Sequence, residues 1–570
     1  MSSKTPPFLV GCFGPDSAVN EIPAVRTSDN LTLARFSAGG SGLLLATHFK
    51  LKEVLPNSFS WSVSGLDNES DLAVQLSEDR LKLSRGRFGR ISFFTAKTGN
   101  LLWFSTRLDV LIRWSGLHPE INTSHLRIFT TYSWFPAPCT PYAEIKALKP
   151  GEEFSFSTTT SSSTLSDSWG TGSQPEPDNN RAASTLEKML LEETERQAID
   201  LHGQTAGVLL SGGLDSSLTA AALARIGMRV HAYCLDFGDY ARTEIEYAEA
   251  VAAHLRIPLR LVPCGPEEVW SALPETISAM DIPYGDGVTV PLFIASRELS
   301  RDCQVLFNGE GGDQLFAGWA NKPMVADSVY GSHRGLLESY MLTFHRFREA
   351  GSAALADDPN GSSLADEIQA AVGDALDESF TGEALLHRLR RANLRLKGAQ
   401  NIQPRATSAG LANGLSVRSL FCSDSIADWT FGLAPSCFLH NSHEKYILKQ
   451  AVRDWLPDKV VWREKRGMGV PTTAWLTGPL WRRLGAFLHP RIISRRGLWQ
   501  SETPLRLATG RLGAPFQGRR IGELLWLLLS LQIWLDDRSL RLSPFVLPAS
   551  VWRALSSASP EAAERLWNSF

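Results

Sequence analysis

Apolar and alternating segments dominate the first part of the chain and predict a β-rich region. They are short, and glycine or proline bounds them, as expected for half-buried strands. We expect strands at Phe8–Gly11, Leu43–Ala46, Ile91–Phe94 and Leu101–Ser105. A polar, low-complexity stretch then runs from Ser157 to Ser168. It cannot bury enough apolar surface to fold alone, so it predicts a linker or a long surface loop.

Helical periods alternate with short apolar strands from about residue 180 onward. Helices are expected at Arg181–Ile199, Ser216–Ile226 and Thr243–Leu255, and strands at Ala206–Leu210, Val230–Asp236, Leu259–Val262 and Val305–Asn308. This alternation favours a parallel sheet with right-handed crossover connections. After about residue 325 we expect the chain to be mostly helical.

These changes of pattern divide an α/β chain into three expected parts. They are residues 1–156, a Ser/Thr-rich linker at 157–180, and residues 181–570. The most hydrophobic stretch is Leu524–Leu535, and its length is about 12 residues. A helix that spans a bilayer needs about 18 or more, so we expect this stretch to form a buried helix.

Composition restricts the class of protein further. The chain has 570 residues, 43% hydrophobic and 21% charged, with a formal net charge of -3. This length suggests several domains, and no basic field indicates a nucleic-acid partner. The seven cysteines are scattered and show no C-x-x-C spacing, which argues against a zinc site or a disulfide framework. No long apolar run follows Met1, so we expect a cytoplasmic protein without a signal peptide or membrane partner.

The segment Ser211–Ser217, with the sequence SGGLDSS, lies between a predicted strand and a predicted helix. Gly212 and Gly213 allow a tight turn and a close approach to a ligand. The helix N-terminus that follows suits pyrophosphate, because its N–H groups are free. Without a metal ion, the Asp215 carboxylate would repel phosphate. Its presence is explained if it holds a Mg²⁺ ion that bridges the phosphates. Hydroxyl donors are added by Ser211, Ser216 and Ser217. A plain capped glycine turn is the alternative, which the complete motif disfavours.

SGGLDSS resembles the pyrophosphate loop of the asparagine synthetase family, which cleaves ATP to AMP and pyrophosphate. The lysine of a Walker A loop is missing. The resemblance implies ATP and Mg²⁺ as cofactors. It also implies an N-terminal Ntn-hydrolase-like αββα sandwich, followed by an adenine-nucleotide α-hydrolase-like (ATP pyrophosphatase) domain with a parallel sheet and a mostly helical C-terminal part.

A second loop, within Phe307–Trp319, resembles the family segment S-G-E-G-x-D-E-L-F-x-G-Y. The resemblance makes Asp313 the second Mg²⁺ ligand, facing Asp215. It makes Glu310 the carboxylate that accepts a proton from the incoming amine as the amide forms. Four further positions align with the family's adenosine contacts: Leu210, Leu235, Asn308 and Gly309.

The third matching block comprises Glu444–Lys449 and Val461–Pro471. It resembles the family pattern K-Y-x-L-R followed by R-x-K-x-G-x-x-x-P. Lys465 aligns with the lysine that neutralises charge developing at the adenylate and the pyrophosphate. A cation in a desolvated site stabilises such a transition state by several kcal/mol.

The N-terminal part departs from the glutamine-using members of the family. They carry a nucleophilic cysteine directly after the initiator methionine, where this chain has Ser2 and Ser3. Cys12 is expected to be a small buried residue of a strand. Later landmarks persist at Arg85–Arg90 and Leu148–Gly151, but the glutamine-binding segment N-G-E-I-Y-N is absent. We therefore expect a glutaminase-like scaffold that does not hydrolyse glutamine.

A second departure lies in the segment that the family uses to shape its acyl-substrate pocket. Ser416 replaces a glutamate, and Ser423 replaces an aspartate beside Asp424. Recognition of ordinary aspartate is therefore in question.

Several functions remain open. An amide-forming ligase would take a small-molecule or peptide carboxylate and ammonia or an amine. Its acid is either aspartate or a natural-product substrate that is closed to a ring, as in β-lactam synthetases and lasso-peptide cyclases. A non-catalytic nucleotide-binding regulatory protein is disfavoured by the retained Asp215, Glu310, Asp313 and Lys465. A sulfur-transferring or tRNA-modifying relative would need reactive cysteines or a basic surface. The family resemblance also allows a homodimer.

Overall fold

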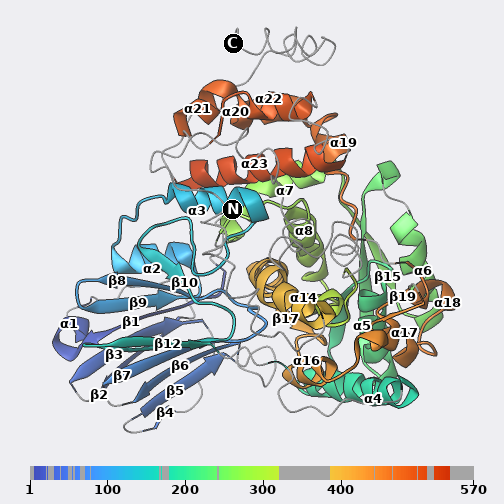
Figure 1. Cartoon of the computed structure of the whole chain (residues 1–570), viewed down its shortest axis with the longest axis horizontal. Coiled ribbons are helices and arrows are strands. Elements are labelled where there is room, and N and C mark those ends of the chain that lie inside the picture. The colour runs from blue at the N-terminus through green and yellow to red at the C-terminus, as the bar shows by residue number, and fades with distance from the viewer. Residues whose placement is uncertain are drawn as a thin grey trace.

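The computed structural model describes residues 6–20, 22, 31–38, 40–48, 54–55, 58–63, 71–77, 79–165, 169, 179–240, 243–280, 282–319, 385–441, 443–464, 467–496, 499–509 and 519–538. Antiparallel sheets form the N-terminal part, and a parallel sheet with helices follows (Figure 1). This arrangement confirms the predicted α/β fold class.

Two six-stranded antiparallel sheets make up the N-terminal part. The first has the order β10-β8-β9-β1-β3-β2, with β1 (Leu9–Pro15), β2 (Thr32–Ala38), β3 (Ser41–Thr47), β8 (Phe94–Thr98), β9 (Leu101–Ser105) and β10 (Ile145–Ala147). The second has the order β12-β11-β7-β6-β5-β4, with β4 (Val54–Leu55), β5 (Ser58–Val63), β6 (Leu72–Ser77), β7 (Arg80–Arg85), β11 (Glu152–Ser157) and β12 (Ser161–Leu165).

The two sheets pack face to face, as the predicted sandwich requires. Their shared core includes Phe13, Leu83 and Phe104. Helices α1 (Asp16–Asn20) and α2 (Leu108–Ser115) pack on the other side of the first sheet, because alternate residues of β1 point that way.

One expected strand begins later than the apolar pattern suggested. Ile91–Phe93 precede β8, which starts at Phe94. Arg85 donates from Nε to the Ile91 carbonyl at 2.9 Å, and the Phe93 carbonyl accepts from the Leu148 N–H at 2.8 Å. A side chain and a neighbouring loop therefore use backbone groups that a sheet neighbour would otherwise take.

The parallel sheet has five strands in the order β15-β14-β13-β16-β17. They are β13 (Thr205–Leu209), β14 (Arg229–Asp236), β15 (Leu259–Pro263), β16 (Val305–Asn308) and β17 (Ser416–Ser419). The chain runs outward from β13 to β14 and β15, then returns to the opposite side of β13 with β16. The loops after β13 and β16 therefore emerge side by side at a topological switch point, where open α/β sheets bind ligands.

Helices surround this sheet and continue to the C-terminal region. The central ones are α3 (Thr123–Tyr132), α4 (Asn179–Ala198), α5 (Leu214–Arg225), α6 (Thr243–Leu255), α7 (Pro266–Ala279), α8 (Thr289–Leu299), α9 (Gly312–Leu315), α14 (Leu385–Asn393), the π-helix Leu394–Ile402, α15 (Gln403–Ala412) and α16 (Asp424–Phe431). The later ones are α17 (Tyr446–Ala451), α18 (Asp458–Val461), α19 (Thr472–Leu476), α20 (Trp481–Leu488), α21 (Pro490–Arg496), α22 (Thr503–Ala508) and α23 (Arg519–Arg538). A short hairpin of β18 (Leu439–His440) and β19 (His443–Glu444) precedes α17.

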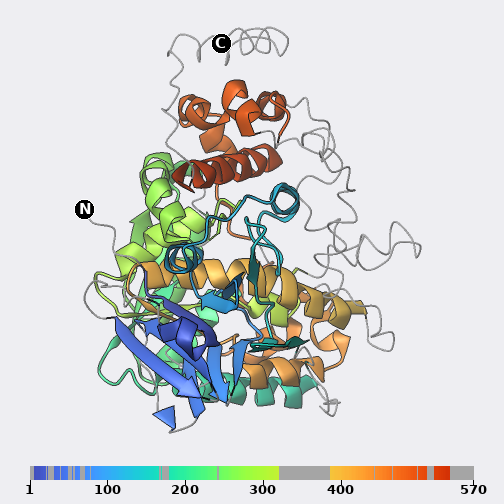
Figure 2. The same ribbon diagram turned by 90° about the vertical axis from the view of Figure 1, so that its left-hand side faces the viewer.

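Helix α23 contains the hydrophobic stretch Leu524–Leu535, whose apolar side chains are buried as expected. It lies between α3 and α7 on one side and α20–α22 on the other (Figures 1 and 2). One apolar cluster unites it with residues of the N-terminal part, and the rings of Tyr142 and Trp534 are 5.9 Å apart. In the part of the chain that is described, no helix is both long enough and apolar enough to cross a membrane.

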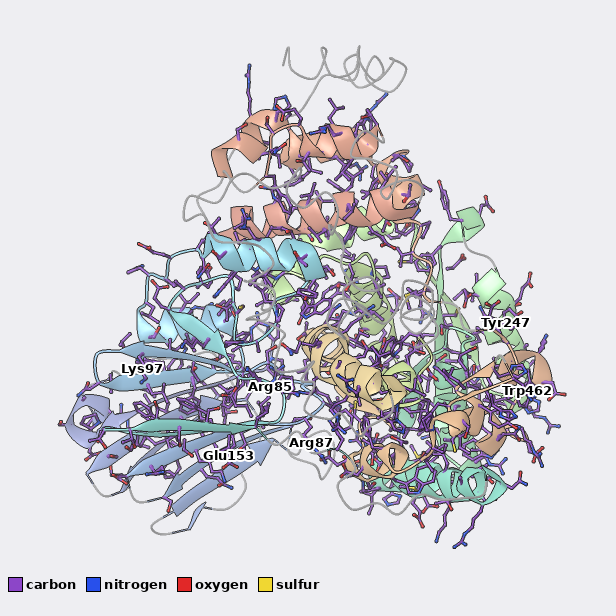
Figure 3. All side chains as sticks on the ribbon, in the orientation of Figure 1. Arg85, Arg87, Lys97, Glu153, Tyr247 and Trp462 are labelled. Atoms are coloured by element: carbon purple, nitrogen blue, oxygen red, sulfur yellow. The ribbon has the colours of Figure 1, made fainter. Side chains whose placement is uncertain are left out.

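Arg87 and Trp169 join the N-terminal sheets to α16. Figure 3 labels Arg87 between the N-terminal sheets and α16. Arg87 forms ion pairs with Asp424 at 2.6 Å and Asp428 at 3.2 Å, and its guanidinium lies 4.0 Å from the Trp169 ring centre. Trp169 is 3% exposed and also contacts the rings of Phe88 and Phe431. The expected linker therefore contains a buried residue, Trp169, that packs between the two parts of the chain. The linker's Ser161–Leu165 segment forms β12. The domain boundary itself stays a prediction.

Candidate active site

The loop Ser211–Ser217 connects β13 to α5, as predicted. Ser216 closes the turn, because its hydroxyl accepts from the Ser211 N–H at 3.1 Å and donates to the Gly213 carbonyl at 3.2 Å. Gly212 has φ +69°, and a Cβ there would lie 2.5 Å from the Cβ of Tyr247 and 2.8 Å from the Ala248 nitrogen. Only glycine fits both this backbone conformation and this contact.

The second loop, Gly309–Gly311, follows β16 and packs directly against the first. A Cβ on Gly312, the first residue of α9, would lie 2.6 Å from the carboxyl carbon of Asp215. Asn308 caps the turn through its Oδ1, which accepts from the Glu310 N–H at 3.1 Å. The Glu310 carbonyl accepts from the Ser419 hydroxyl at 2.6 Å, so the end of β17 also fixes this loop.

Asp215 and Asp313 meet at the ammonium group of Lys445. The Nζ atom lies 2.6 and 2.5 Å from the two carboxylate oxygens of Asp215 and 2.5 Å from Oδ1 of Asp313. The Lys445 side chain is 2% exposed, and those of Asp215 and Asp313 are 12% and 29% exposed. The predicted facing of the two acids is therefore present, with a positive charge between them.

The pair of acids suits a magnesium ion. Mg²⁺ is usually held by one or two carboxylates, with water and substrate phosphates as its other ligands. Among the described residues, no group of three or more His, Cys, Asp or Glu side chains gathers as an all-protein metal cage would require. The Lys445 ammonium contacts both carboxylates, so their oxygens converge on one point.

Lys445 is a residue whose role the sequence did not reveal. It belongs to the quoted K-Y-x-L-R-like block, but nothing in its neighbours assigned it to the two acids. Its backbone φ of +54° is left-handed, which is uncommon for a residue other than glycine. Such strain is often stored at functional positions.

Arg463 braces the first loop from the third block. Its Nη1 donates to the Gly212 carbonyl at 3.2 Å, and its Nη2 forms an ion pair with Glu244 of α6. The guanidinium also stacks on the Tyr247 ring at 4.0 Å, near Trp462 (Figure 3). Lys449 donates to the Arg463 carbonyl at 3.3 Å and to Glu444 at 3.2 Å. Lys465, two residues further on, lies outside the described residues.

The predicted adenosine contacts lie around the same sheet edge. Leu210 is buried and its N–H donates to the Tyr233 carbonyl at 2.8 Å, which joins the loop to β14. Leu235 is partly buried near the end of β14, and Asn308 ends β16. Gly309 faces the start of α5, where its Cβ position would be 2.7 Å from the Ser216 nitrogen. Ser217 is fully buried.

The segment after α15, which the family resemblance assigns to the acyl-substrate pocket, forms β17 and leads into α16. Ser416 pairs with Val305 at the amino end of β17, which is the edge opposite the two loops. Ser419, at the carboxyl end, is the residue that touches Glu310. Ser423 precedes α16, and the adjacent Asp424 pairs with Arg87 of the N-terminal part. An altered acyl pocket in this segment stays a prediction.

Cys12 lies in the middle of β1, paired on both sides with β3 and β9. Its side chain is 0% exposed and packs with Val19, Leu44 and Trp103. Burial raises the pKa of the thiol to about 12, so the thiolate needed for nucleophilic attack is disfavoured. Ser2 lies outside the described residues.

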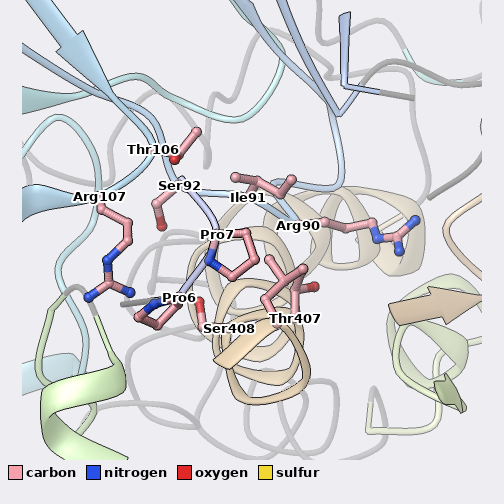
Figure 4. A pocket seen from close by; sticks show the side chains of 10 residues that line it. Pro6, Pro7, Arg90, Ile91, Ser92, Thr106, Arg107, Thr407 and Ser408 are labelled. Atoms are coloured by element: carbon pink, nitrogen blue, oxygen red, sulfur yellow. The ribbon is translucent and has the colours of Figure 1, made fainter. Parts of the chain in front are cut away.

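A small cavity at the junction of the two parts is separate from the loops. It is lined by Pro7, Arg90, Thr106 and Thr407, among others (Figure 4). Its volume of about 20 Å³ has room for about one water molecule. None of the described candidate residues lines it, so the loops rather than this cavity define the candidate site.

Comparison with known proteins places these features in a family. The family model described as Asparagine synthase matches residues 188–536. Asparagine synthetase [glutamine-hydrolyzing] 1 of Bacillus subtilis (strain 168) is 22% identical over 426 residues, covering 67% of this chain and 64% of that protein. Asparagine synthetase [glutamine-hydrolyzing] 3 of the same organism is 22% identical over 445 residues, covering 72% and 69%. The chain thus spans less than two thirds of the first of these relatives.

Solved structures show weaker likeness. NMN synthetase from Francisella tularensis matches at 12% identity over 40% of this chain and 97% of that chain, with a TM-score of 0.21. The NH3-dependent NAD synthetase from Campylobacter jejuni matches at 17% identity over 36% and 97%, with a TM-score of 0.19.

Proposed function

The chain belongs to the asparagine synthase family, and on this basis we propose that it is an ATP-dependent carbon–nitrogen ligase. In the proposed reaction, a carboxylate oxygen attacks the α-phosphorus of ATP, the α–β bond breaks, and pyrophosphate leaves with the bonding electrons. Ammonia or an amine then attacks the acyl carbon of the adenylate, and AMP leaves as the amide forms. The observation that carries this proposal is the meeting of Asp215, Asp313 and Lys445 beside the glycine loop.

Each part of the site has a proposed task. Asp215 and Asp313 would hold Mg²⁺, which when bound neutralises charge on the phosphates. The pyrophosphate would lie against the α5 N-terminus, near Ser211, Gly212, Gly213, Ser216 and Ser217. The adenosine contacts would be Leu210, Leu235, Asn308 and Gly309.

Two residues would act on the reacting groups. Glu310 would accept the proton that the attacking nitrogen loses. Lys465 would stabilise negative charge at the adenylate and the pyrophosphate. Both roles rest on the family resemblance, supported for Glu310 by its place in the loop that touches Asp215.

We propose ammonia or a substrate amine, rather than glutamine, as the nitrogen donor. The burial of Cys12 supports this proposal, because a thiol with a pKa of about 12 is protonated at neutral pH. The acid remains a choice between aspartate and a dedicated natural-product substrate closed to a ring. A purely regulatory nucleotide-binding role is the third candidate, and turnover separates it from both.

The proposed function is tested by product analysis with ATP, Mg²⁺ and candidate acids, beginning with aspartate. AMP and pyrophosphate should form in equal amounts and only when an acid is present. Ammonium should support amide formation, and glutamine should not exceed the nitrogen-free blank.

Release of ADP and phosphate would contradict the adenylation chemistry. Glutamine-driven turnover that survives removal of free ammonia would contradict the proposed nitrogen donor. Nucleotide binding without turnover across a broad panel of amino acids and peptides would favour the regulatory role.

Arg463 should act as a positioning residue for the glycine loop. Replacing Arg463 with glutamine removes the ion pair with Glu244, the bond to Gly212 and the stacking on Tyr247. We expect kcat/KM for ATP to fall by about 10- to 100-fold, which corresponds to about 1.4–3 kcal/mol. Initial rates of pyrophosphate release over a range of ATP concentrations measure this change.

Arg483→Gln is the matched control, because Arg483 pairs with Glu267 at a surface position. Exposed ion pairs contribute little, so this variant should stay within about twofold of the wild type. The double variant Arg463→Gln/Glu244→Gln should lose less than the product of the single effects, because the two residues share one contact. Full additivity would argue against the brace.

A further inference from the structure

The Lys445 ammonium lies at the point where Asp215 and Asp313 converge, and the proposed function assigns that point to a divalent metal. All three of its short contacts are to carboxylate oxygens, at 2.5 to 2.6 Å. The side chain is almost completely buried. An ammonium and a divalent cation therefore compete for the same oxygens.

We propose that Lys445 keeps free divalent metal out of the site until a nucleotide arrives, so that the metal enters together with the nucleotide's phosphates. This inference rests on the proposed function, because it takes the two acids as metal ligands. It concerns what the lysine does before catalysis, and it assigns Lys445 a role in the order of binding.

Electrostatics supports this order. Two carboxylates and one ammonium carry a net charge of -1, and the ammonium offsets the cost of burying two like charges together. A metal ion alone would have to displace the ammonium, leaving a nearly inaccessible positive charge without an acceptor. Phosphate oxygens of a nucleotide supply such acceptors, because a lysine ammonium donates three hydrogen bonds. Metal and nucleotide should therefore favour each other's binding.

The backbone supports a dedicated placement of this ammonium. Lys445 has φ +54° and ψ +31° immediately before α17, a left-handed backbone conformation that residues other than glycine rarely adopt. One turn along the same helix, Lys449 is equally buried but pairs with Glu444 at 3.2 Å, away from the two acids. Of these two buried lysines, Lys445 contacts the two acids and Lys449 contacts Glu444.

Metal binding measured without catalysis tests the proposal. Mn²⁺ would be titrated into the full chain and followed by electron paramagnetic resonance, with and without α,β-methylene ATP, in which the bond to be cleaved is replaced. The wild type should bind Mn²⁺ alone at least about tenfold more weakly than in the presence of the analogue, within the usual range of coupling between sites. Lys445→Met should bind Mn²⁺ alone at least about tenfold more tightly than the wild type does. Lys459→Met, which removes the same charge at an exposed position of α18, should stay within about twofold of the wild type.

Equal Mn²⁺ affinity in the wild type and in folded Lys445→Met would overturn the proposal. So would equal Mn²⁺ affinity of the wild type with and without the analogue, a result that decides the question even if the variant does not fold. Failure of the wild type to bind the analogue at all would instead contradict the proposed function. Circular dichroism and thermal melting establish whether each variant is folded.

Discussion

Replacing Asp215 with asparagine is expected to lower kcat/KM for ATP-dependent pyrophosphate release by about 10³-fold, or about 4 kcal/mol. The substitution keeps the shape of the side chain but removes one negative charge that would hold the metal, and such a metal contributes several kcal/mol to stabilising a phosphoryl transition state. Gly312 approaches the carboxyl group so closely that a Cβ there would lie 2.6 Å from its carbon, which restricts movement of the side chain on that side. Pyrophosphate release at saturating and limiting Mg²⁺ measures the loss.

Asp302→Asn is the control for this prediction. Asp302 also pairs with a basic side chain, Arg260 at 3.1 Å, but it precedes β16 and so lies toward the amino edge of the parallel sheet. Its loss should leave kcat/KM within about twofold. Retention of wild-type activity by Asp215→Asn would show that the two acids do not hold the metal.

Gly212→Ala should abolish activity and destabilise the chain by about 2–5 kcal/mol. Alanine at φ +69° costs about 1–2 kcal/mol in backbone strain. The new methyl group would also overlap Tyr247 and the backbone of Ala248, and overpacking of this kind typically adds 1–3 kcal/mol. Urea denaturation and pyrophosphate release measure the two effects.

Gly227→Ala isolates the contribution of the contact. Gly227 follows the other end of α5 with φ +80°, and nothing lies within 4 Å of its Cβ position. This variant should lose only about 1–2 kcal/mol and keep its activity. Similar losses in the two variants would mean that backbone strain alone, and not the packing of the loop against α6, constrains Gly212.

The parallel sheet and its two loops were predictable because local signals agreed there. Val305–Asn308 and Thr243–Leu255 were expected at the bounds that the structure has. An apolar run that ends at Gly309 marks the strand, and a helical period followed by Pro258 marks the helix. The strand β17 was not predicted because Ser416–Ser419 is short and three of its four residues are polar. Its pairing with β16 depends on a contact across the fold. Ile91–Phe93 is the opposite case, because the apolar pattern predicted a strand that the structure does not have there. Arg85 binds the Ile91 carbonyl, and an apolar pattern carries no information about such a contact.

The candidate site was predictable only where a motif carried it. Asp215 and Asp313 meet as expected, because the loops that bear them follow neighbouring strands. Lys445 and Arg463 act through contacts with residues more than 200 positions away, such as Asp215 and Gly212. No local periodicity reports such contacts, and from the sequence a lysine just before a short helix looks like a surface residue.

The apolar cluster shared by α23 and the N-terminal part has an evolutionary consequence. Side chains such as Phe129, Trp134 and Ile145 complete the same core as Leu525 and Leu528. A descendant that deleted the sandwich would expose this surface and lose the ion pairs of Arg87 as well. Selection can therefore relax on any catalytic activity of residues 1–156 and still retain these residues, because their apolar side chains support the packing of α23.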